Sequence, residues 1–175
     1  ASQTIDGLES LERLAVNIIL EQTIIFYQIS EKKYGNFPFY LDASASSGLT
    51  VNFTSSNENV LTIEGNLASI VNAGTVTITA NQTGNEGYTS TSIDQEISII
   101  KGTIIATADD QSKIQGESNP ELTISYEGFK YGDSVDDLDI VPQVSTEVTT
   151  ESLPGTYDII LTTGSDNNYN FDLVN

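Results

Sequence analysis

The sequence predicts an all-β chain of tandem immunoglobulin-like β-sandwich domains, each with about seven short antiparallel strands. Two observations carry this prediction. Apolar and polar residues alternate along several segments, as in Leu49, Val51 and Phe53, which are separated by single polar residues. This period of two is typical of half-buried strands. The order of motifs also recurs along the chain, since the Thr-Ile-Ile sequence of residues 23–25 returns at residues 103–105, an offset of 80.

Further alternating segments predict the remaining strands, because clusters of Gly, Asn and Ser separate them. In the first part of the chain they lie near residues 24–28, 39–43, 59–63, 67–71, 75–80 and 93–100, and in the second part near residues 122–126, 140–145 and 157–162. Regular short strands with turn signals between them are typical of a sandwich or barrel. Two apolar faces would pack together, and the Thr and Ser faces would contact water.

The repeat extends over most of the chain, at an offset that drifts only from 80 to 82 residues. The matching pairs are Lys33 and Lys113, Gly35 and Gly116, Pro38 and Pro120, Gly74 and Gly155, Ile78 and Ile159, and Tyr88 and Tyr169. This many matches in one order predict two copies of the same structural unit. We therefore expect residues 22–101 to form repeat A and residues 102–175 to form repeat B, with almost no linker between them.

The flanking residues predict that the chain comes from a longer array. Residues 16–20 resemble residues 97–101, which precede repeat B, so residues 1–21 are interpreted as the closing strand or linker from a preceding repeat. The residues before Val16 also allow a short helix. Repeat A continues well past Tyr88, whereas repeat B stops six residues after Tyr169. We therefore expect repeat B to be truncated before its last strand.

The composition argues against several kinds of partner and chemistry. The chain has 6 basic and 25 acidic residues and a formal charge of −19, so nucleic-acid phosphates and anionic membrane surfaces would repel it. No apolar run reaches the length of about eighteen residues that indicates a membrane span. Because the chain has neither His nor Cys, it cannot form a Ser-His-Asp or Cys-His arrangement and lacks the usual zinc ligands.

Carboxylate pairs are the remaining route to catalysis, because two carboxyl groups can hydrolyse a glycosidic bond. Adjacent pairs occur at Asp109-Asp110 and Asp136-Asp137. Neighbouring residues on a strand point to opposite faces, so such a pair does not converge on one substrate. We therefore expect no enzymatic activity, and no cofactor other than calcium.

Calcium is a candidate because acidic residues gather in repeat B. The candidate ligands are Asp133, Asp136, Asp137 and Asp166, whose carboxylate oxygens are of the type that calcium prefers. A calcium ion held by them would stiffen a joint between domains. The spacing does not match a known calcium loop, and a solvated turn whose charge favours solubility is the alternative interpretation.

About 150 residues of the chain resemble a known group of repeats. The segments that carry the resemblance include Lys33-Tyr34-Gly35 and Gly84-Asn85-Glu86-Gly87-Tyr88 in repeat A, and Pro154-Gly155-Thr156-Tyr157 and Asn167-Asn168-Tyr169-Asn170 in repeat B. They are similar to bacterial immunoglobulin-like repeats, including the MBG type with its Tyr-Gly signature, which occur in very large cell-surface adhesins. Repeat B departs from this signature at Gln115, where Tyr would stand before Gly116.

The resemblance implies a set of structural signature residues: Tyr34, Gly35, Gly74, Tyr88, Gly116, Gly155 and Tyr169. Glycines 35, 74, 116 and 155 are expected at turns that need a positive φ. The aromatic residues Tyr34, Phe37, Phe39 and Tyr40 allow two interpretations. They either pack in the core or form an exposed platform for sugar rings.

The resemblance also implies export to the bacterial cell surface, as in adhesins of gliding Bacteroidota, often by type IX secretion. Such repeats mostly serve as a stalk. We therefore expect an extracellular structural segment of an adhesin that extends a distal binding region and bears mechanical load. Its partners would be neighbouring repeats of the same polypeptide, with extracellular glycans or surfaces as further candidates. The alternative is a glycan- or protein-binding module that acts directly in adhesion.

Overall fold

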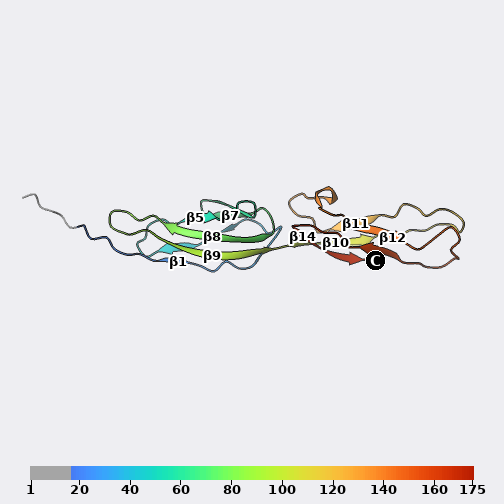
Figure 1. The fold of residues 1–175 in the computed structure, drawn as a ribbon, viewed down its shortest axis with the longest axis horizontal. Coiled ribbons are helices and arrows are strands. Elements are labelled where there is room, and N and C mark those ends of the chain that lie inside the picture. The colour runs from blue at the N-terminus through green and yellow to red at the C-terminus, as the bar shows by residue number, and fades with distance from the viewer. Residues whose placement is uncertain (1–16) are drawn as a thin grey trace, which may run out of the picture.

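The computed structural model describes residues 17–175, which fold into two β-sandwiches placed end to end (Figure 1). The predictions made for residues 1–16 lie outside this range. The strands are β1 (Ile24–Phe26), β2 (Lys32–Lys33), β3 (Phe39–Tyr40), β4 (Ala43–Ala45), β5 (Asn52–Ser55), β6 (Leu61–Glu64), β7 (Leu67–Ile70), β8 (Gly74–Gln82), β9 (Thr91–Ile100), β10 (Gly102–Ala108), β11 (Ile124–Glu127), β12 (Gln143–Thr146), β13 (Ile159–Thr162) and β14 (Tyr169–Val174). The one helical element among the described residues is a 3-10 turn, η1 (Val135–Asp137), so the all-β prediction is confirmed.

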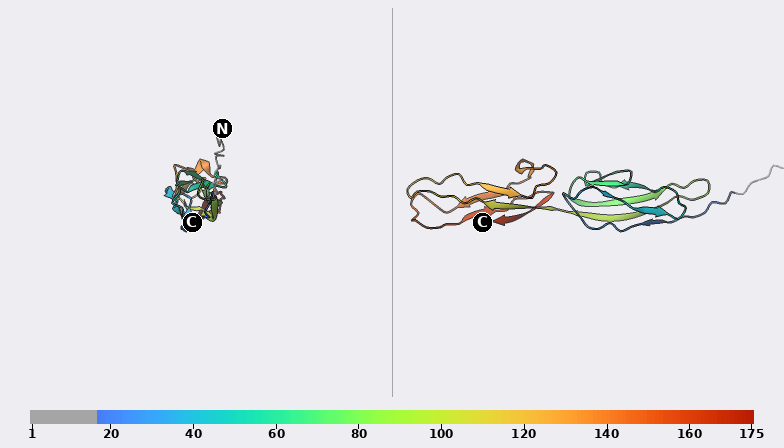
Figure 2. Two further views of the ribbon diagram at one scale, coloured as in Figure 1. Left: turned by 90° about the vertical axis from the view of Figure 1, so that its left-hand side faces the viewer. Right: turned by 180° about the vertical axis from the view of Figure 1, so that it is seen from behind.

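Each strand pair of the described chain joins two strands on the same side of Lys101. Sandwich A (residues 22–101) has a four-stranded sheet in the order β2-β9-β8-β5, a three-stranded sheet β3-β7-β6 and the pair β1-β4. Sandwich B (residues 102–175) has the sheet β11-β10-β14 and the pair β12-β13. The two views in Figure 2 show a narrow, elongated molecule. Within residues 17–175, no helix has the length and hydropathy needed to cross a membrane.

The core of sandwich A follows the predicted alternation. Along β8, Val76, Ile78 and Ala80 are buried, and the threonines between them lie on the other face. Leu61 from β6 and Ile99 from β9 pack into the same apolar cluster. Complete burial of one such aliphatic side chain contributes about 1.5–3 kcal/mol, so packing between the sheets stabilises the sandwich.

Two strand pairs are parallel, although the sequence predicts antiparallel strands. β2 runs parallel to the end of β9, and β10 runs parallel to β14. Each pair joins a strand near the start of a sandwich to its last strand, so the rest of the sandwich forms the long crossover that a parallel pair requires. The prediction missed this direction because alternation has the same period in parallel and antiparallel strands.

The residues after Tyr169 form β14, which is equivalent to residues 88–93 of repeat A and not to the second half of the closing strand β9, so the truncation of repeat B before its last strand stays a prediction. Tyr169, Phe171 and Leu173 point inward and the residues between them point outward, as expected for a half-buried strand. β14 pairs with β10 over six residue pairs. Comparison with repeat A obscures this strand, because the equivalent residues 88–93 lie partly outside β9.

The repeat offers a matched pair of core substitutions. Ile78 and Ile159 occupy equivalent positions, but Ile78 is fully buried and Ile159 is only half-buried. Ile78→Ala is expected to lower the free energy of unfolding by about 2–5 kcal/mol, because it opens a cavity in a closed core. Ile159→Ala should lower it by less than half as much. Urea unfolding followed by circular dichroism measures both losses, and equal losses would contradict the difference in packing.

Candidate functional site at the junction of the two sandwiches

The two sandwiches meet with almost no connecting chain. β9 ends at Ile100 and β10 begins at Gly102, so Lys101 is the single residue between them. Figure 1 shows the chain passing directly from the end of one sandwich into the other. Polar and aromatic side chains from both sandwiches gather at this connection. Four of them, Tyr34, Tyr131, Asp133 and Tyr169, are called the junction cluster below.

Tyr34 reaches from sandwich A into the junction cluster. It follows β2, and its main-chain N–H donates to the carbonyl of Ile100 at 2.8 Å. Its side chain is only 6% exposed, and its hydroxyl donates to Oδ2 of Asp133 in sandwich B at 2.9 Å. The hydroxyl of Tyr169, also in sandwich B, donates to the same oxygen at 2.6 Å. One carboxylate oxygen therefore accepts a phenol from each sandwich.

Tyr169 is itself held in place by sandwich B. The main-chain N–H of Lys130 donates to the Tyr169 hydroxyl at 2.8 Å. The main-chain N–H of Tyr169 donates to Oδ1 of Asp166 at 3.0 Å. Because both ends of this residue are fixed, Asp133 and Tyr169 form a preorganised acceptor for the Tyr34 hydroxyl. A hydrogen bond to a charged group of this kind contributes about 1.5–3 kcal/mol.

The aromatic rings of the junction cluster pack edge to face. The Tyr34 ring meets Tyr169 at a centroid distance of 5.3 Å and an interplanar angle of 89°. It meets Tyr131 at 5.2 Å and 88°. Such pairs contribute about 0.5–1.5 kcal/mol beyond the burial of area. The Tyr131 hydroxyl also donates to the carbonyl of Asn36 at 2.6 Å, so each sandwich sends a tyrosine to the other.

Gly35 allows the two sandwiches to approach closely. Its φ is 91°, in the region that favours glycine. A Cβ at this position would lie 2.3 Å from Cγ of Lys130 in sandwich B, which is far inside van der Waals contact. The Tyr-Gly pair therefore serves the junction in two ways. Tyr34 supplies the phenol that bridges the two sandwiches, and Gly35 leaves room for the side chain of Lys130.

A second group of contacts crosses the junction through Asn168. Its Oδ1 accepts from the main-chain N–H of Ala73 at 2.8 Å, and its Nδ2 donates to Oδ1 of Asn72 at 2.9 Å. Lys33 adds a further link, since its Nζ donates to Oγ1 of Thr103 at 3.1 Å. These contacts and the junction cluster all join the same two bodies, so a relative rotation would break several of them together.

The phenols of the junction cluster remain donors over a wide pH range. Burial raises the pKa of Tyr34 and of Tyr169 well above the ordinary value, and the hydrogen bond to Asp133 raises each pKa further. The negative charge of Asp133 adds to this effect, because ionising either phenol would place two anions side by side.

The structure gives three of the four candidate calcium ligands protein partners. Asp133 holds the two tyrosines, and Asp137 caps η1 by accepting from the N–H and hydroxyl of Ser134. Asp166 accepts from the N–H groups of residues 168 and 169, and Asp136 lies exposed in η1. Among residues 17–175, no group of three or more acidic side chains is placed to hold a metal ion. Calcium binding stays a prediction.

The remaining signature residues have different surroundings. Gly74 and Gly116 have φ values of 146° and 90°. The expectation of a positive φ was wrong for Gly155, which lies in an exposed bend before β13 and has no left-handed φ. Tyr88 forms an isolated parallel bridge with Leu20, at the position where Tyr169 pairs with Gly102 in sandwich B.

The predicted aromatic group is divided between the core and the surface. Tyr34 is buried in the junction, and the Phe39 ring lies under Nζ of Lys32 at 4.4 Å. Phe37 and Tyr40 are 89% and 74% exposed. Sequence reasoning missed Tyr131 and Asn168 as junction residues. Both had a signal, since Asn168 belongs to a matched motif and Lys130-Tyr131-Gly132 repeats the residues of Lys33-Tyr34-Gly35.

The protein therefore belongs to the class of tandem all-β sandwich proteins, and its two sandwiches are joined through polar and aromatic contacts. Residues 104–175 match the family model of the MBG domain (YGX type), which confirms the predicted resemblance of repeat B to the MBG type. This is a repeat-type domain of extracellular proteins, and the family is not an enzyme family. No curated protein and no solved structure matches the chain.

The raised tyrosine pKa values predict a loss of stability in alkali. A group whose pKa is raised by folding contributes stability below its unfolded value, about 10 for Tyr, and this contribution disappears as the pH rises. The free energy of unfolding should therefore fall more steeply above about pH 10 in the wild type than in Tyr34→Phe. Urea unfolding at a series of pH values measures the slope. Tyr40→Phe, on an exposed ring, is the matched control and should keep the wild-type slope; equal slopes in all three would contradict the role of Tyr34.

Proposed function

We propose that this chain is a stalk segment of a secreted bacterial cell-surface adhesin, which extends a distal binding region and bears mechanical load. The observation that carries the proposal is the shared acceptor at the junction, where Asp133 holds Tyr34 from one sandwich and Tyr169 from the other. A spacer must keep its domains aligned, and this contact forms only in one relative orientation.

The connection between the sandwiches also suits a load-bearing role. A pulling force along the chain passes from β9 to β10 through Lys101 alone. β9 pairs with β8 over nine residue pairs, and β10 pairs with β14 over six. Force directed along paired strands loads many hydrogen bonds at once, so each sandwich resists extension better than one whose bonds open singly.

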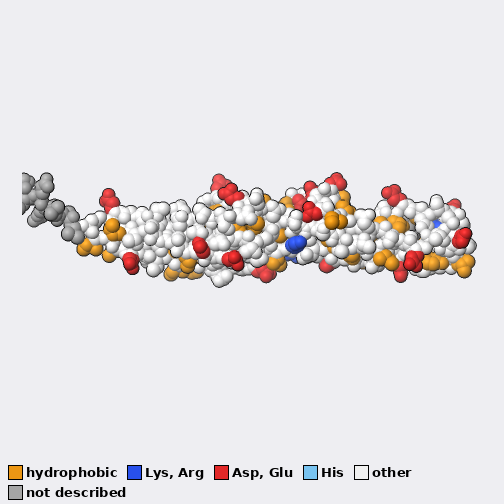
Figure 3. Space-filling view, viewed as in Figure 1, with side chains coloured by type: hydrophobic (Ala, Val, Ile, Leu, Met, Phe, Trp, Pro, Cys, Tyr) orange, Lys and Arg blue, Asp and Glu red, His pale blue; other side chains and the backbone are white. Residues whose placement is uncertain are grey.

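The surface charge fits a hydrated, extracellular segment. Figure 3 shows acidic side chains distributed along the visible face of both sandwiches. With a formal charge of −19, neighbouring copies repel one another and remain solvated. We place the segment outside a bacterial cell, with type IX secretion as the export route and gliding cells as one setting. Its partners are neighbouring repeats of the same polypeptide.

A direct binding role is the second candidate, favoured by the exposure of Phe37 and Tyr40. Exposed aromatic faces can stack on sugar rings, which would make this chain a glycan-binding module. The two residues flank Phe39, whose ring is partly covered by Lys32. This candidate accounts for the exposed rings but leaves the junction cluster without a role.

The stalk proposal predicts a narrow distribution of end-to-end distances. Because the chain has no Cys, spin labels can be attached to Glu86→Cys and Glu151→Cys, both on exposed loops, and their separation measured by pulsed electron resonance. Asp133→Ala should broaden the distribution, because it removes two hydrogen bonds worth about 1.5–3 kcal/mol each. Asp136→Ala, which changes an exposed neighbour, should leave it narrow. A broad distribution in the otherwise unchanged chain would refute a rigid stalk.

The binding alternative predicts a different sensitivity. If the chain adheres to glycans through its exposed rings, Phe37→Ala with Tyr40→Ala should reduce retention on glycan-coated surfaces at least about tenfold, since each stacked ring contributes roughly 1 kcal/mol or more. Under the stalk proposal the chain shows no retention to lose. Thr62→Ala with Thr79→Ala, which changes two non-aromatic surface residues, is the control.

A further inference from the structure

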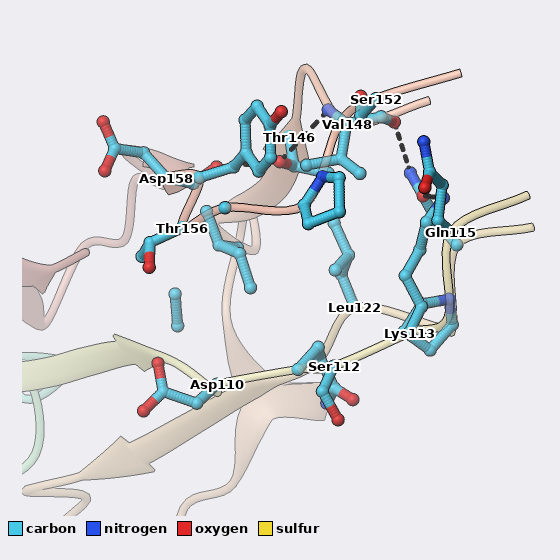
Figure 4. Close-up of a pocket in the computed structure, with 18 of the residues that line it drawn as sticks. Asp110, Ser112, Lys113, Gln115, Leu122, Thr146, Val148, Ser152, Thr156 and Asp158 are labelled. Atoms are coloured by element: carbon cyan, nitrogen blue, oxygen red, sulfur yellow. Dashed lines mark hydrogen bonds between the residues drawn. The ribbon is translucent and has the colours of Figure 1, made fainter. Parts of the chain in front are cut away.

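Sandwich B has a groove at the end farthest from the junction. Its volume is about 570 Å³, and Leu122, Val148 and Ile159 contribute its apolar lining. Figure 4 shows the groove between the segment that contains Ser112 and Lys113 and the segment that contains Thr156, with Leu122 pointing into the space between them. Polar and charged residues, among them Asp110, Lys113 and Thr156, line the rest of the groove. A groove of this mixed chemistry between two segments can accept a further strand whose apolar side chains contact the apolar part of the lining.

Sandwich A shows what covers the equivalent surface. Val76 is 2% exposed, whereas its equivalent at an offset of 81, Tyr157, is 45% exposed. Leu41 is buried, whereas its equivalent Leu122 is half-buried. Val76 and Leu41 share one apolar cluster with Ile97 and Ile99, which lie in the second half of β9. This part of β9 pairs antiparallel with β8 from Ile78↔Gln95 to Gly74↔Ile99 and parallel with β2.

The equivalent main chain in sandwich B is free to pair. β13 begins only at Ile159, where it faces Thr146 of β12. Within the described chain, residues 155–158 have no main-chain hydrogen bond to another strand. Such an edge can pair with an added strand, because its unpaired main-chain N–H and C=O groups can form hydrogen bonds with that strand. The added strand needs apolar residues at alternate positions, so that one of its faces contacts Leu122, Val148 and Ile159.

One segment of this chain has that pattern in its sequence. Residues 14–19 read Leu-Ala-Val-Asn-Ile-Ile, and at an offset of 81 they match residues 95–100, Gln-Glu-Ile-Ser-Ile-Ile, the part of β9 that covers sandwich A. Ile18 is 74% exposed and Ile19 is 51% exposed on sandwich A. Residues 14–19 contain no charged side chain, so local repulsion does not oppose their insertion.

We propose that the groove of sandwich B binds residues 14–19 of a second copy of this chain, as an antiparallel partner for residues 155–159. The register of sandwich A then places Ile18 opposite Gly155, as Ile99 lies opposite Gly74. Ile18 takes the place of the buried Ile99, and Ile19 takes the place of Ile100, which stays 41% exposed. The proposal rests on the groove and does not depend on the stalk function.

The geometry of the docked copy follows from the repeat. Leu20 is bridged in parallel to Tyr88 at the start of sandwich A, as Gly102 is paired with Tyr169 at the start of sandwich B. A copy held by residues 14–19 therefore places its sandwich A beyond sandwich B of the first copy, as B follows A within one chain. The contact is head to tail, so it leads to open linear assemblies and not to closed dimers.

Sedimentation velocity of the 175-residue chain, from micromolar to millimolar concentration in moderate salt, tests the proposal. We expect concentration-dependent linear oligomers. Ile18→Asp should weaken association at least about tenfold, because it would bury an unpaired carboxylate in the groove. Ile19→Asp is the matched control, since it adds the same charge at the neighbouring position that stays exposed, and it should change association by less than about twofold.

Hydrogen exchange identifies the groove as the place of contact. At concentrations where the wild type associates, the amides of residues 155–159 should exchange more slowly, and in Ile18→Asp they should exchange as in the monomer. Because Ile18 is exposed, the variant should keep the wild-type unfolding midpoint, which separates lost association from lost folding. A chain that stays monomeric at millimolar concentration, association that Ile18→Asp leaves unchanged, or protection elsewhere than residues 155–159 would each overturn the proposal.

Discussion

The alignment of the two sandwiches depends on one carboxylate. Asp133 is partly buried, and a charge in such a place is stable only when donors satisfy it. Its Oδ2 has two donors, Tyr169 from its own sandwich and Tyr34 from the other. Sandwich B alone supplies one of these two donors. Asp133 therefore favours the one orientation of sandwich A in which Tyr34 donates the second hydrogen bond. Apolar packing alone would tolerate a range of rotations.

This view gives the Tyr-Gly signature a physical meaning. Tyr34 and Gly35 lie at the end of sandwich A that faces the next sandwich, and both are explained by what they meet there, Asp133 and Lys130. At the equivalent end of sandwich B stands Gln115, which lines the groove. A glutamine cannot supply a buried aromatic ring, so the two ends of the molecule differ in chemistry although the fold repeats.

The sequence predicted what depends on local periodicity. The alternation along β8 located a strand and its buried face, because side chains on a strand alternate whatever their partners. It could not predict which strands pair in parallel or that Tyr131 meets Asn36, contacts set by the path of the whole chain. The hydrogen bond from Tyr34 to Asp133 was missed for the same reason, because the two residues lie 99 positions apart in the chain. A carboxylate has the same appearance in a sequence whether it accepts hydrogen bonds from phenols or binds a metal ion.

The two sandwiches also show that an apolar pattern is not sufficient to close a core. Residues 74–78 and 155–159 are equivalent in the repeat, yet Val76 is buried and Tyr157 is exposed. The difference lies in the main chain, because β9 pairs with the whole first segment, whereas in the second segment only Ile159 pairs with a described strand, β12. A neighbouring strand covers side chains on one face and satisfies the N–H and C=O groups at the edge. Strand pairing therefore decides how many of the alternating apolar side chains each repeat buries. The pairing that β9 provides in sandwich A is what an added strand would provide in sandwich B.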